Sequence, residues 1–357
     1  MASEKVSVVF LWAEVVGYLH AVFRYLSDKR GVALKVVHWD KRDQNTTQYN
    51  IESIDGVQFI NRSETSDDVI YQILRDSRPA IIVVSGWMDS GYICACRRYK
   101  IENSSVKIVA GIDDMWTGSL RQRLGQLYFR LNYRSLFDYL WISGQPQYSF
   151  AQRFGYGIDN IIQNLYSADT GLFLKDRASI SRRFVFVGRF VKIKAIDILV
   201  EAYCNLPNSV QKQWPLLLIG DGDQKACILD RRNENITVIP FLQPEELRLE
   251  LLKGGVGCLP THKDQWGVVL HEFALMGLPI LASSGCGAAT EFLISGFNGF
   301  MFKNGSVSDL SRAMLLFVNL NDSSLMSFSD NGISLGSRIS THSSADSLLS
   351  VLYKVKV

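Results

Sequence analysis

The chain has 357 residues, a length typical of about two domains at ~150 residues each. Its composition, 47% hydrophobic and 20% charged, is ordinary for a globular protein and excludes a disordered or fibrous chain. The formal charge of +3 gives no electrostatic reason to expect a nucleic-acid partner.

The N-terminus and the cysteines predict a cytoplasmic protein. The opening MASEKVSVVFLW lacks the basic start, long apolar core and cleavage site of a signal peptide. No apolar stretch is long and uncharged enough to suggest a membrane span. The six cysteines are scattered, without the spacing of a zinc site, and we interpret all of them as reduced thiols.

Short β-rich runs alternate with amphipathic segments in the first half of the chain. The segment 18–30 has apolar residues at helical spacing, and 67–77 is a second predicted helix. Strands are predicted at 6–12, 32–39, 80–87, 106–113 and 139–143. This order is typical of a parallel sheet with helices on both faces.

The same alternation restarts after residue 178. Predicted strands are 183–189, 214–222, 236–242, 255–260 and 279–283, with helices at 195–206, at 244–254 and from about Val268. The polar stretch 175–184 is predicted to separate two doubly wound α/β domains. Their expected bounds are residues 1–178 and 179–340, with a closing helix in residues 341–357.

A cationic group follows the first strand of the second half, in VGRFVKIKAID. Gly188 and Arg189 end the strand, and Lys194 comes at the start of a helix. Arginine, lysine and a helix N-terminus together could hold a diphosphate. The alternative is ordinary surface charge beside a strand.

Two carboxylates bracket a largely apolar stretch, DQWGVVLHE. Asp264 lies in a loop after a strand, and Gly267 permits close backbone approach at the helix start. Glu272 falls within the helix, where an unpaired carboxylate is costly and needs a hydroxyl or a cation. The alternative is that Glu272 pairs with a neighbouring Lys or Arg.

Two glycine-rich loops, GDGD (220–223) and GCGAATEF (285–292), also follow strands; either could be an ordinary turn. The first strand is not followed by GxGxxG, which argues against a dinucleotide fingerprint. HEFAL is not HExxH, so a zinc-protease site is not expected, and we see no other metal-ligand cluster.

Taken in order, these pieces resemble the retaining glycosyltransferases of family 4, which have the GT-B fold. The matching segments are FVFVGRFVKIKAIDILVEAY, LLLIGDGD, VIPFLQPEELRLELL, GCLPTHKDQWGVVLHEFALMGLPILASSGCGAATEFL and GFNGFMF, within about residues 183–303. The first half matches loosely, in LWISGQPQ and QNLYSADTGLF. The resemblance implies two Rossmann-like domains facing a central cleft, the first for the acceptor and the second for a nucleotide-sugar donor. It also implies a C-terminal helix that closes back on the first domain.

The resemblance also implies residue roles. Glu272 would bind the ribose hydroxyls of the nucleotide, and Asp264 the hydroxyls of the donor sugar. Arg189 and Lys194 would neutralise the diphosphate leaving group. Further donor contacts fall on Gly17, Gly188, Phe241, Leu242, Gln265, Trp266, Gly267, Val268 and Val269.

Two positions depart from the family pattern. Asp264 stands where the family usually has Glu, so its carboxylate reaches one methylene less far. Asp113 and Asp114 stand where the family often has His; together with Trp116 they could contact the acceptor or the sugar. The alternative for the two aspartates is a cap on the following helix.

The expected function is therefore a retaining, metal-independent glycosyltransferase without a cofactor. Its substrate would be a UDP- or GDP-linked sugar, and its acceptor a lipid-linked glycan in surface polysaccharide biosynthesis (capsule, O-antigen or exopolysaccharide). The alternatives are a non-catalytic glycosyltransferase-like binding protein and a sugar-phosphate or disaccharide synthase of the same fold.

A basic and aromatic segment in the first half bears on the acceptor. Residues 97–134 hold eight Lys or Arg against three acids, with aromatic residues between them. Such a helix suits the anionic inner leaflet of a membrane, near a lipid-linked acceptor. The alternative is an amphipathic helix whose apolar face packs on the core and whose basic face is solvated.

Overall fold

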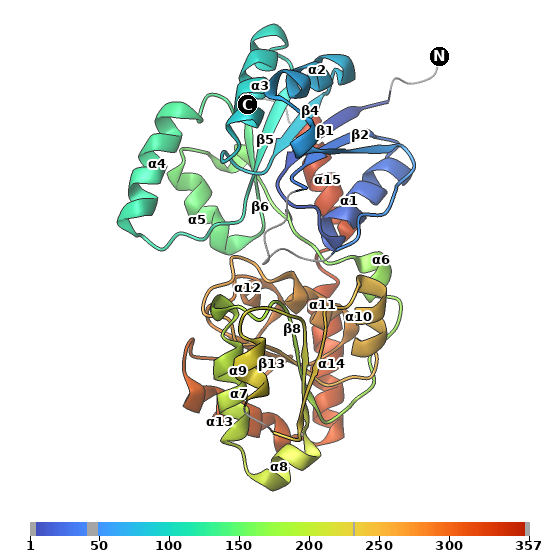
Figure 1. Cartoon of the computed structure of the whole chain (residues 1–357), viewed down its shortest axis with the longest axis vertical. Helices are drawn as coiled ribbons and strands as arrows, with labels where there is room; N and C mark the ends of the chain where they lie inside the picture. The colour runs from blue at the N-terminus through green and yellow to red at the C-terminus, as the bar shows by residue number, and fades with distance from the viewer. Residues whose placement is uncertain (1–4, 41–48, 231–232, 354–357) are drawn as a thin grey trace. The chain divides into compact units, whose positions relative to one another are not determined.

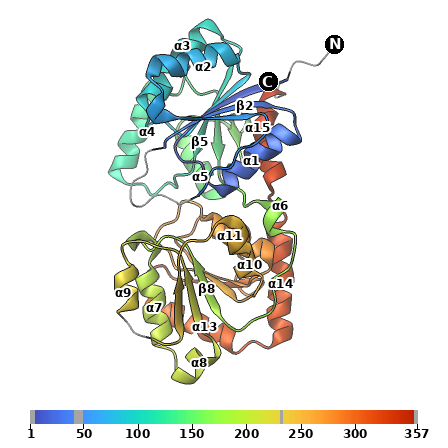
Figure 2. The same cartoon turned by 45° about the vertical axis from the view of Figure 1, so that its right-hand side comes forward.

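The computed structural model describes residues 5–40, 49–230 and 233–353. The chain divides into two compact units, Met1–Ser167 with Thr341–Val357, and Ala168–Ser340. Each unit is a parallel sheet covered by helices on both faces, as Figures 1 and 2 show. The predicted architecture of two doubly wound α/β domains is confirmed.

The first unit has a seven-stranded sheet in the order β3-β2-β1-β4-β5-β6-β7, and every pair of neighbours is parallel. Its strands are β1 (Ser7–Trp12), β2 (Ala33–His38), β3 (Val57–Asn61), β4 (Ile81–Val84), β5 (Lys107–Ile112), β6 (Tyr139–Ile142) and β7 (Ile161–Ile162). Its helices are α1 (Gly17–Asp28), α2 (Asp67–Ser77), α3 (Ser90–Glu102), α4 (Leu120–Asn132), α5 (Gln145–Arg153) and α15 (Thr341–Leu349).

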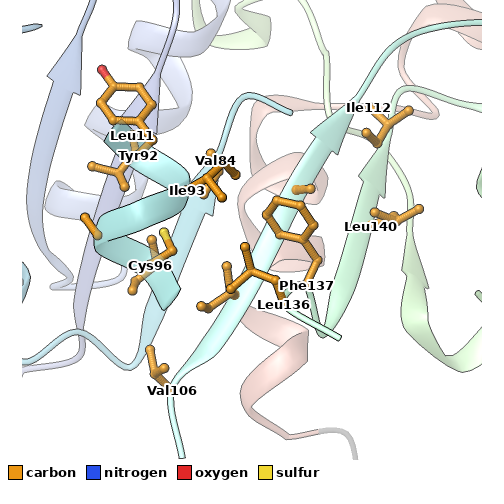
Figure 3. Packing of buried hydrophobic residues seen from close by; sticks show 14 of the residues in the cluster. Leu11, Val84, Tyr92, Ile93, Cys96, Val106, Ile112, Leu136, Phe137 and Leu140 are labelled. Atoms are coloured by element: carbon orange, nitrogen blue, oxygen red, sulfur yellow. The ribbon is translucent and has the colours of Figure 1, made fainter. Parts of the chain in front are cut away.

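Two apolar clusters lie on the two faces of this sheet. One joins strand residues to α2, α3 and α5, and Figure 3 shows Tyr92, Ile93 and Cys96 of α3 in it. The other joins the opposite strand residues to α1 and to Ala345 and Leu348 of α15. Because side chains alternate along a strand, one set of strands fills both layers.

The second unit has a six-stranded parallel sheet in the order β10-β9-β8-β11-β12-β13. Its strands are β8 (Phe184–Val187), β9 (Leu216–Ile219), β10 (Ile236–Ile239), β11 (Val256–Leu259), β12 (Ile280–Ser283) and β13 (Gly299–Phe302). Its helices are α6 (Thr170–Phe173), α7 (Ile196–Cys204), α8 (Asn208–Gln213), α9 (Lys225–Leu229), α10 (Pro244–Leu251), α11 (Val268–Met276), α12 (Ala289–Phe292), α13 (Val307–Val318) and α14 (Asp322–Gly336). Helix α7 packs against α13, and α11 against α14.

The boundary between the units lies earlier in the chain than residues 178 and 179. The segment from Ala168 already belongs to the second unit. Within it, the Ala178 N–H donates to the Met276 carbonyl at 2.9 Å, and the Ser179 N–H donates to Leu252 at 2.9 Å. The polar stretch that suggested a linker is therefore hydrogen-bonded to the second sheet unit along its backbone.

The closing helix packs on the first unit, as predicted, and its last predicted residues, 354–357, lie outside the described residues. Helix α15 lies against α1, and Arg30 forms an ion pair with Asp346 at 2.5 Å. Among the described residues, no helix combines the length and the hydropathy needed to cross a bilayer.

Both sheets reverse their strand order once, between β1 and β4 and between β8 and β11. In such sheets the loops at the carboxyl ends of the two central strands diverge and leave a crevice for a ligand. In the second unit these loops are the ones that carry Lys194 and Asp264.

Candidate functional site

The loop after β8 is held against the loop after β9. The Phe190 N–H donates to the Asp221 carbonyl at 2.7 Å, and the Gly188 N–H to Ile219 at 3.0 Å. Gly220 has φ +144°, and a Cβ there would lie 2.0 Å from the carbonyl oxygen of Gly188. The GDGD segment is thus needed for close packing of two loops, which an ordinary turn does not require.

Replacing Gly220 with alanine is expected to destabilise the second unit by more than ~2 kcal/mol, because the new Cβ would clash with backbone in a strained conformation. Calorimetry would show one transition moved to a lower temperature. The matched control is Gly125→Ala in α4, where an added Cβ meets nothing within 4 Å. At that position alanine is expected to raise the free energy of unfolding by about 0.5–1 kcal/mol. An unchanged transition for Gly220→Ala would contradict this packing.

The loops after β8 and β11 meet at the reversal of the strand order. The Thr261 hydroxyl and the His262 N–H both donate to the Ile193 carbonyl at 2.9 Å. Beside them, the Lys194 ammonium forms an ion pair with the Asp264 carboxylate, and these side chains are only 18% and 13% exposed. The structure therefore brings two predicted site residues into direct contact with each other. Arg189, on the same loop as Lys194, is exposed.

The segment from Asp264 to Trp266 is fastened to the GCG loop after β12. The Asp264 N–H donates to Gly285 at 2.9 Å, the Gly287 N–H to the Asp264 carbonyl at 3.0 Å, and the Ala288 N–H to the Trp266 carbonyl at 2.7 Å. This pairing holds the backbone around Asp264 in place. The Trp266 side chain is 2% exposed, so only its backbone could reach a ligand.

Helix α11 begins directly after this loop. Gly267, with φ +88°, turns the chain into the helix, and a Cβ there would lie 3.0 Å from the Cys286 sulfur. Gly267 has no side chain with which to cap α11, and the N–H groups of Val268 and Val269 fall in the first turn, where no intrahelical acceptor exists. These groups and the helix dipole favour a negatively charged or oxygen-rich ligand. The half-buried Gln265 precedes them.

Glu272 lies one turn further along α11 and is half-buried. Burial, together with the nearby Asp169 carboxylate, raises the pKa of its carboxyl to about 7. The alternative that Glu272 pairs with a neighbouring Lys or Arg is wrong for the described residues, where it forms no ion pair. A carboxyl group in this setting gains most from a ligand that donates hydroxyl hydrogen bonds to it.

His271 is a residue of this region that the sequence did not single out. It is fully buried; its Nδ1 accepts from the Ala168 N–H at 2.9 Å, and its Nε2–H donates to the Gly336 carbonyl at 2.9 Å. Its ring stacks on Phe292 at 4.2 Å. Burial lowers the pKa of His271 to about 4. The imidazole therefore stays neutral and fixes α11 against α14. The only indication of its burial in the sequence is that its neighbours on the helix are apolar.

The remaining predicted donor residues lie at other strand ends. Phe241 and Leu242 are half-buried in the segment between β10 and α10, at the edge of the same sheet. Gly188 follows β8 directly. Gly17 is the first residue of α1, after β1 of the first unit.

The predicted acceptor residues follow β5 in the first unit. The Tyr166 hydroxyl donates to the Asp113 carboxylate at 3.4 Å, and the Gln147 side chain to the Asp113 carbonyl at 2.9 Å. The following helix, α4, is capped by Ser119, so a capping role for Asp113 or Asp114 there is wrong. Trp116 lies 4.5 Å from the Arg153 guanidinium.

Comparison with known proteins places this site in context. The family described as glycosyl transferases group 1 matches residues 176–334. Two uncharacterized glycosyltransferases of Methanocaldococcus jannaschii are 24% identical over 152 residues, covering 42% of this chain and 41% of the relative, and 22% identical over 166 residues, covering 45% and 42%. The chain thus aligns with about two-fifths of the length of these relatives.

Solved structures match over nearly the whole chain. The sucrose-phosphate synthase of Thermosynechococcus elongatus superposes with a TM-score of 0.75 at 14% identity, covering 98% of both chains. Anabaena HepE in complex with UDP and glucose superposes with a TM-score of 0.72 at 12% identity, covering 99% of this chain and 100% of the other. At these identities the likeness shows the fold, which is GT-B, as predicted.

Proposed function

We propose that this chain, whose second unit carries a domain of glycosyl transferases group 1 in a GT-B fold, is a glycosyltransferase that uses a nucleotide-diphosphate sugar. The observation that carries the proposal is the grouping at one sheet edge of Lys194, Asp264 and the uncapped start of α11, with Glu272 one turn on. Cationic and N–H groups suit phosphates, and carboxylates suit sugar hydroxyls.

In this proposal the second unit binds the donor. Arg189 and Lys194 hold the diphosphate, Glu272 accepts hydrogen bonds from the ribose hydroxyls, and Asp264 accepts from the donor sugar. The backbone of Gln265 and the first turn of α11 complete the sugar contacts. The ion pair between Lys194 and Asp264 keeps both side chains in position until the donor separates their charges between phosphate and sugar.

The chemical step is a substitution at the anomeric carbon of the sugar. The bond to the diphosphate oxygen breaks, the acceptor oxygen bonds to that carbon, and the acceptor proton passes to the departing phosphate. We propose retention of configuration, with the acceptor entering on the face that the diphosphate leaves. Arg189, Lys194 and the α11 dipole stabilise the growing negative charge, so a metal ion is not required in this scheme.

For the donor we propose a UDP- or GDP-linked sugar, and the UDP–glucose complexes of HepE support the first. For the acceptor we propose a lipid-linked glycan in surface polysaccharide synthesis, in the cytoplasm at the inner membrane leaflet. The structural likeness to WaaB, a lipopolysaccharide outer core galactosyltransferase, supports this. The likeness to a sucrose-phosphate synthase favours a second candidate, transfer to a free sugar phosphate.

A donor panel tests the proposal. Purified protein would be incubated in EDTA with UDP-, GDP- and dTDP-sugars, with either a lipid-linked glycan or a sugar phosphate as acceptor, and nucleoside diphosphate release measured. One donor is expected to react, and Lys194→Met is expected to slow release by ~100-fold or more, because it removes a positive charge at the leaving group. The matched control is Lys192→Met, an exposed lysine on the same turn.

The acceptor that accelerates release separates the two candidate functions. Donor binding without release in every mixture would support a non-catalytic binding protein. Absence of binding to every donor would contradict the assigned site.

A further inference from the structure

Helix α4 of the first unit turns its apolar side chains outward. Of its 13 residues only Phe129 is buried. Its leucines are strongly exposed: Leu120 by 77%, Leu124 by 69%, Leu127 by 57% and Leu131 by 75%. Figures 1 and 2 both place α4 at the periphery of the unit. The alternative from the sequence, an apolar face packed on the core, holds for the α3 part of the basic segment, where Tyr99 is buried while Arg97 and Arg98 are exposed, but it is wrong for the leucines of α4.

The spacing of these leucines puts all four on one stripe. At 100° per residue, positions 120, 124, 127 and 131 fall within about 60° of one another, on the side opposite Phe129. Arg121 flanks the stripe on one side, and Arg123 and Arg130 flank it on the other; all three are exposed. A contiguous apolar stripe with a charged rim marks an interaction surface rather than chance exposure.

The charge around this stripe selects its partner. Residues 115–137 contain four arginines and no Asp or Glu. Two copies of α4 packed through their leucines would bring their arginines together without a compensating acid. A surface of anionic lipid instead accepts the leucines among its acyl chains and the arginines at its phosphates.

We propose that α4 lies flat in the surface of an anionic bilayer, with Leu120, Leu124, Leu127 and Leu131 inserted and the three flanking arginines at the headgroup phosphates. A helix of 13 residues is about 20 Å long, too short to span the apolar core, so it lies in the plane of the membrane. The inference deepens the proposed function by naming the element that would bring the enzyme to a lipid-linked acceptor, but it stands on α4 alone.

Vesicle flotation tests the proposal with the full-length protein. Vesicles of phosphatidylglycerol and phosphatidylcholine in equal parts would be compared with vesicles of phosphatidylcholine alone. We expect binding to the anionic vesicles that weakens with added salt. Changing the four α4 leucines to glutamine is expected to weaken it by on the order of 100-fold or more, because their insertion supplies most of the apolar contact.

The matched control changes three exposed leucines of the second unit, Leu229, Leu249 and Leu316, to glutamine and is expected to bind vesicles as the wild type does. A third variant, Arg121→Gln with Arg123→Gln and Arg130→Gln, is expected to lose the preference for anionic vesicles. Circular dichroism confirms that each variant is folded.

Two outcomes would overturn the proposal. One is equal vesicle binding by the leucine variant and the wild type. The other is a wild-type dimer, seen by sedimentation and lost in the leucine variant, with no vesicle binding, which would make α4 a self-association surface. Donor binding in solution, measured on the same proteins, is expected to be unchanged by the α4 substitutions. If the wild type does not bind a donor, the proposed function is contradicted, whereas the vesicle-binding result still stands.

Discussion

Glu272→Gln is expected to stabilise the second unit at pH 8 by on the order of 2–3 kcal/mol while weakening donor binding. Burial and Asp169 raise the pKa of this carboxyl from its ordinary value of 4.5 to about 7. Between these two values the folded state binds a proton that the unfolded state has released. Stability therefore falls as the pH rises through this window, by up to about 1.4 kcal/mol per unit, and the cost is fully present above pH 7. Glutamine removes it.

Calorimetry at several pH values measures this effect. The unfolding temperature of the variant is expected to exceed that of the wild type by roughly 5–10 °C at pH 8 and to match it near pH 4.5. The transition of the second unit is the one that Gly220→Ala lowers. The control is Glu201→Gln, an exposed glutamate on α7 of the same unit, which should show no pH-dependent difference. A Glu272→Gln protein that is less stable at pH 8 would contradict the raised pKa.

The titration of His271 masks that of Glu272 in the wild type, so the wild type has to be compared with Glu272→Gln. Its pKa is lowered by burial from 6.5 to about 4, so its contribution to stability is lost as the pH falls through that range. Over pH 4.5–6.5 the two neighbouring groups act in opposite directions and largely cancel in the wild type. Without the Glu272 carboxyl, the acid loss due to His271 should become visible.

The same substitution reports on donor binding. If Glu272 accepts hydrogen bonds from the ribose, the bound donor favours the ionised carboxylate. Wild-type affinity is then expected to fall as the pH drops below about 7, and Glu272→Gln is expected to bind ~10-fold or more weakly with little pH dependence. Isothermal titration with the reactive donor measures both. Unchanged donor affinity in Glu272→Gln would show that Glu272 does not contact the donor.

Breaking the ion pair between Lys194 and Asp264 is the second large effect that we expect. These side chains are mostly buried, at 18% and 13% exposure, so Lys194→Met or Asp264→Asn leaves a charge without its partner. Each single variant is expected to lose about 1–3 kcal/mol of stability. The double variant should lose less stability than the two single variants lose together, with a coupling energy between Lys194 and Asp264 of about 1 kcal/mol or more.

Across the wild type, the two single variants and the double variant, the transfer rate should not change in parallel with stability. If Lys194 acts on the leaving diphosphate and Asp264 on the sugar, the double variant recovers stability but stays ~100-fold or more below the wild-type rate. Nucleoside diphosphate release and calorimetry on the same four proteins separate the two effects. Recovery of the rate together with stability would show that the pair only supports the fold.

Local patterns in the sequence predict ten of the thirteen strands of the described residues, missing β3, β7 and β13, and they predict the sheet edge that carries the site. The apolar runs 183–189 and 255–260 predict strands, and they contain β8 and β11. Because parallel strands end at the same edge, the positions of Lys194 and Asp264 after these two runs predict that their loops lie at the same edge of the sheet, and the strand order then makes them neighbours. Glycine at 267 likewise indicates the sharp entry into α11, and its φ of +88° agrees.

What those residues touch depends on the folded chain. The contact between Lys194 and Asp264 joins positions far apart in the sequence, and the raised pKa of Glu272 depends on Asp169, which the sequence pattern assigns to the first domain. The spacing of the α4 leucines shows that they share one face, but periodicity alone cannot tell a core-facing stripe from an exposed one. Burial is a property of the packed chain, and so charge partners, titration and outward-facing apolar surfaces emerge only when distant segments are brought together.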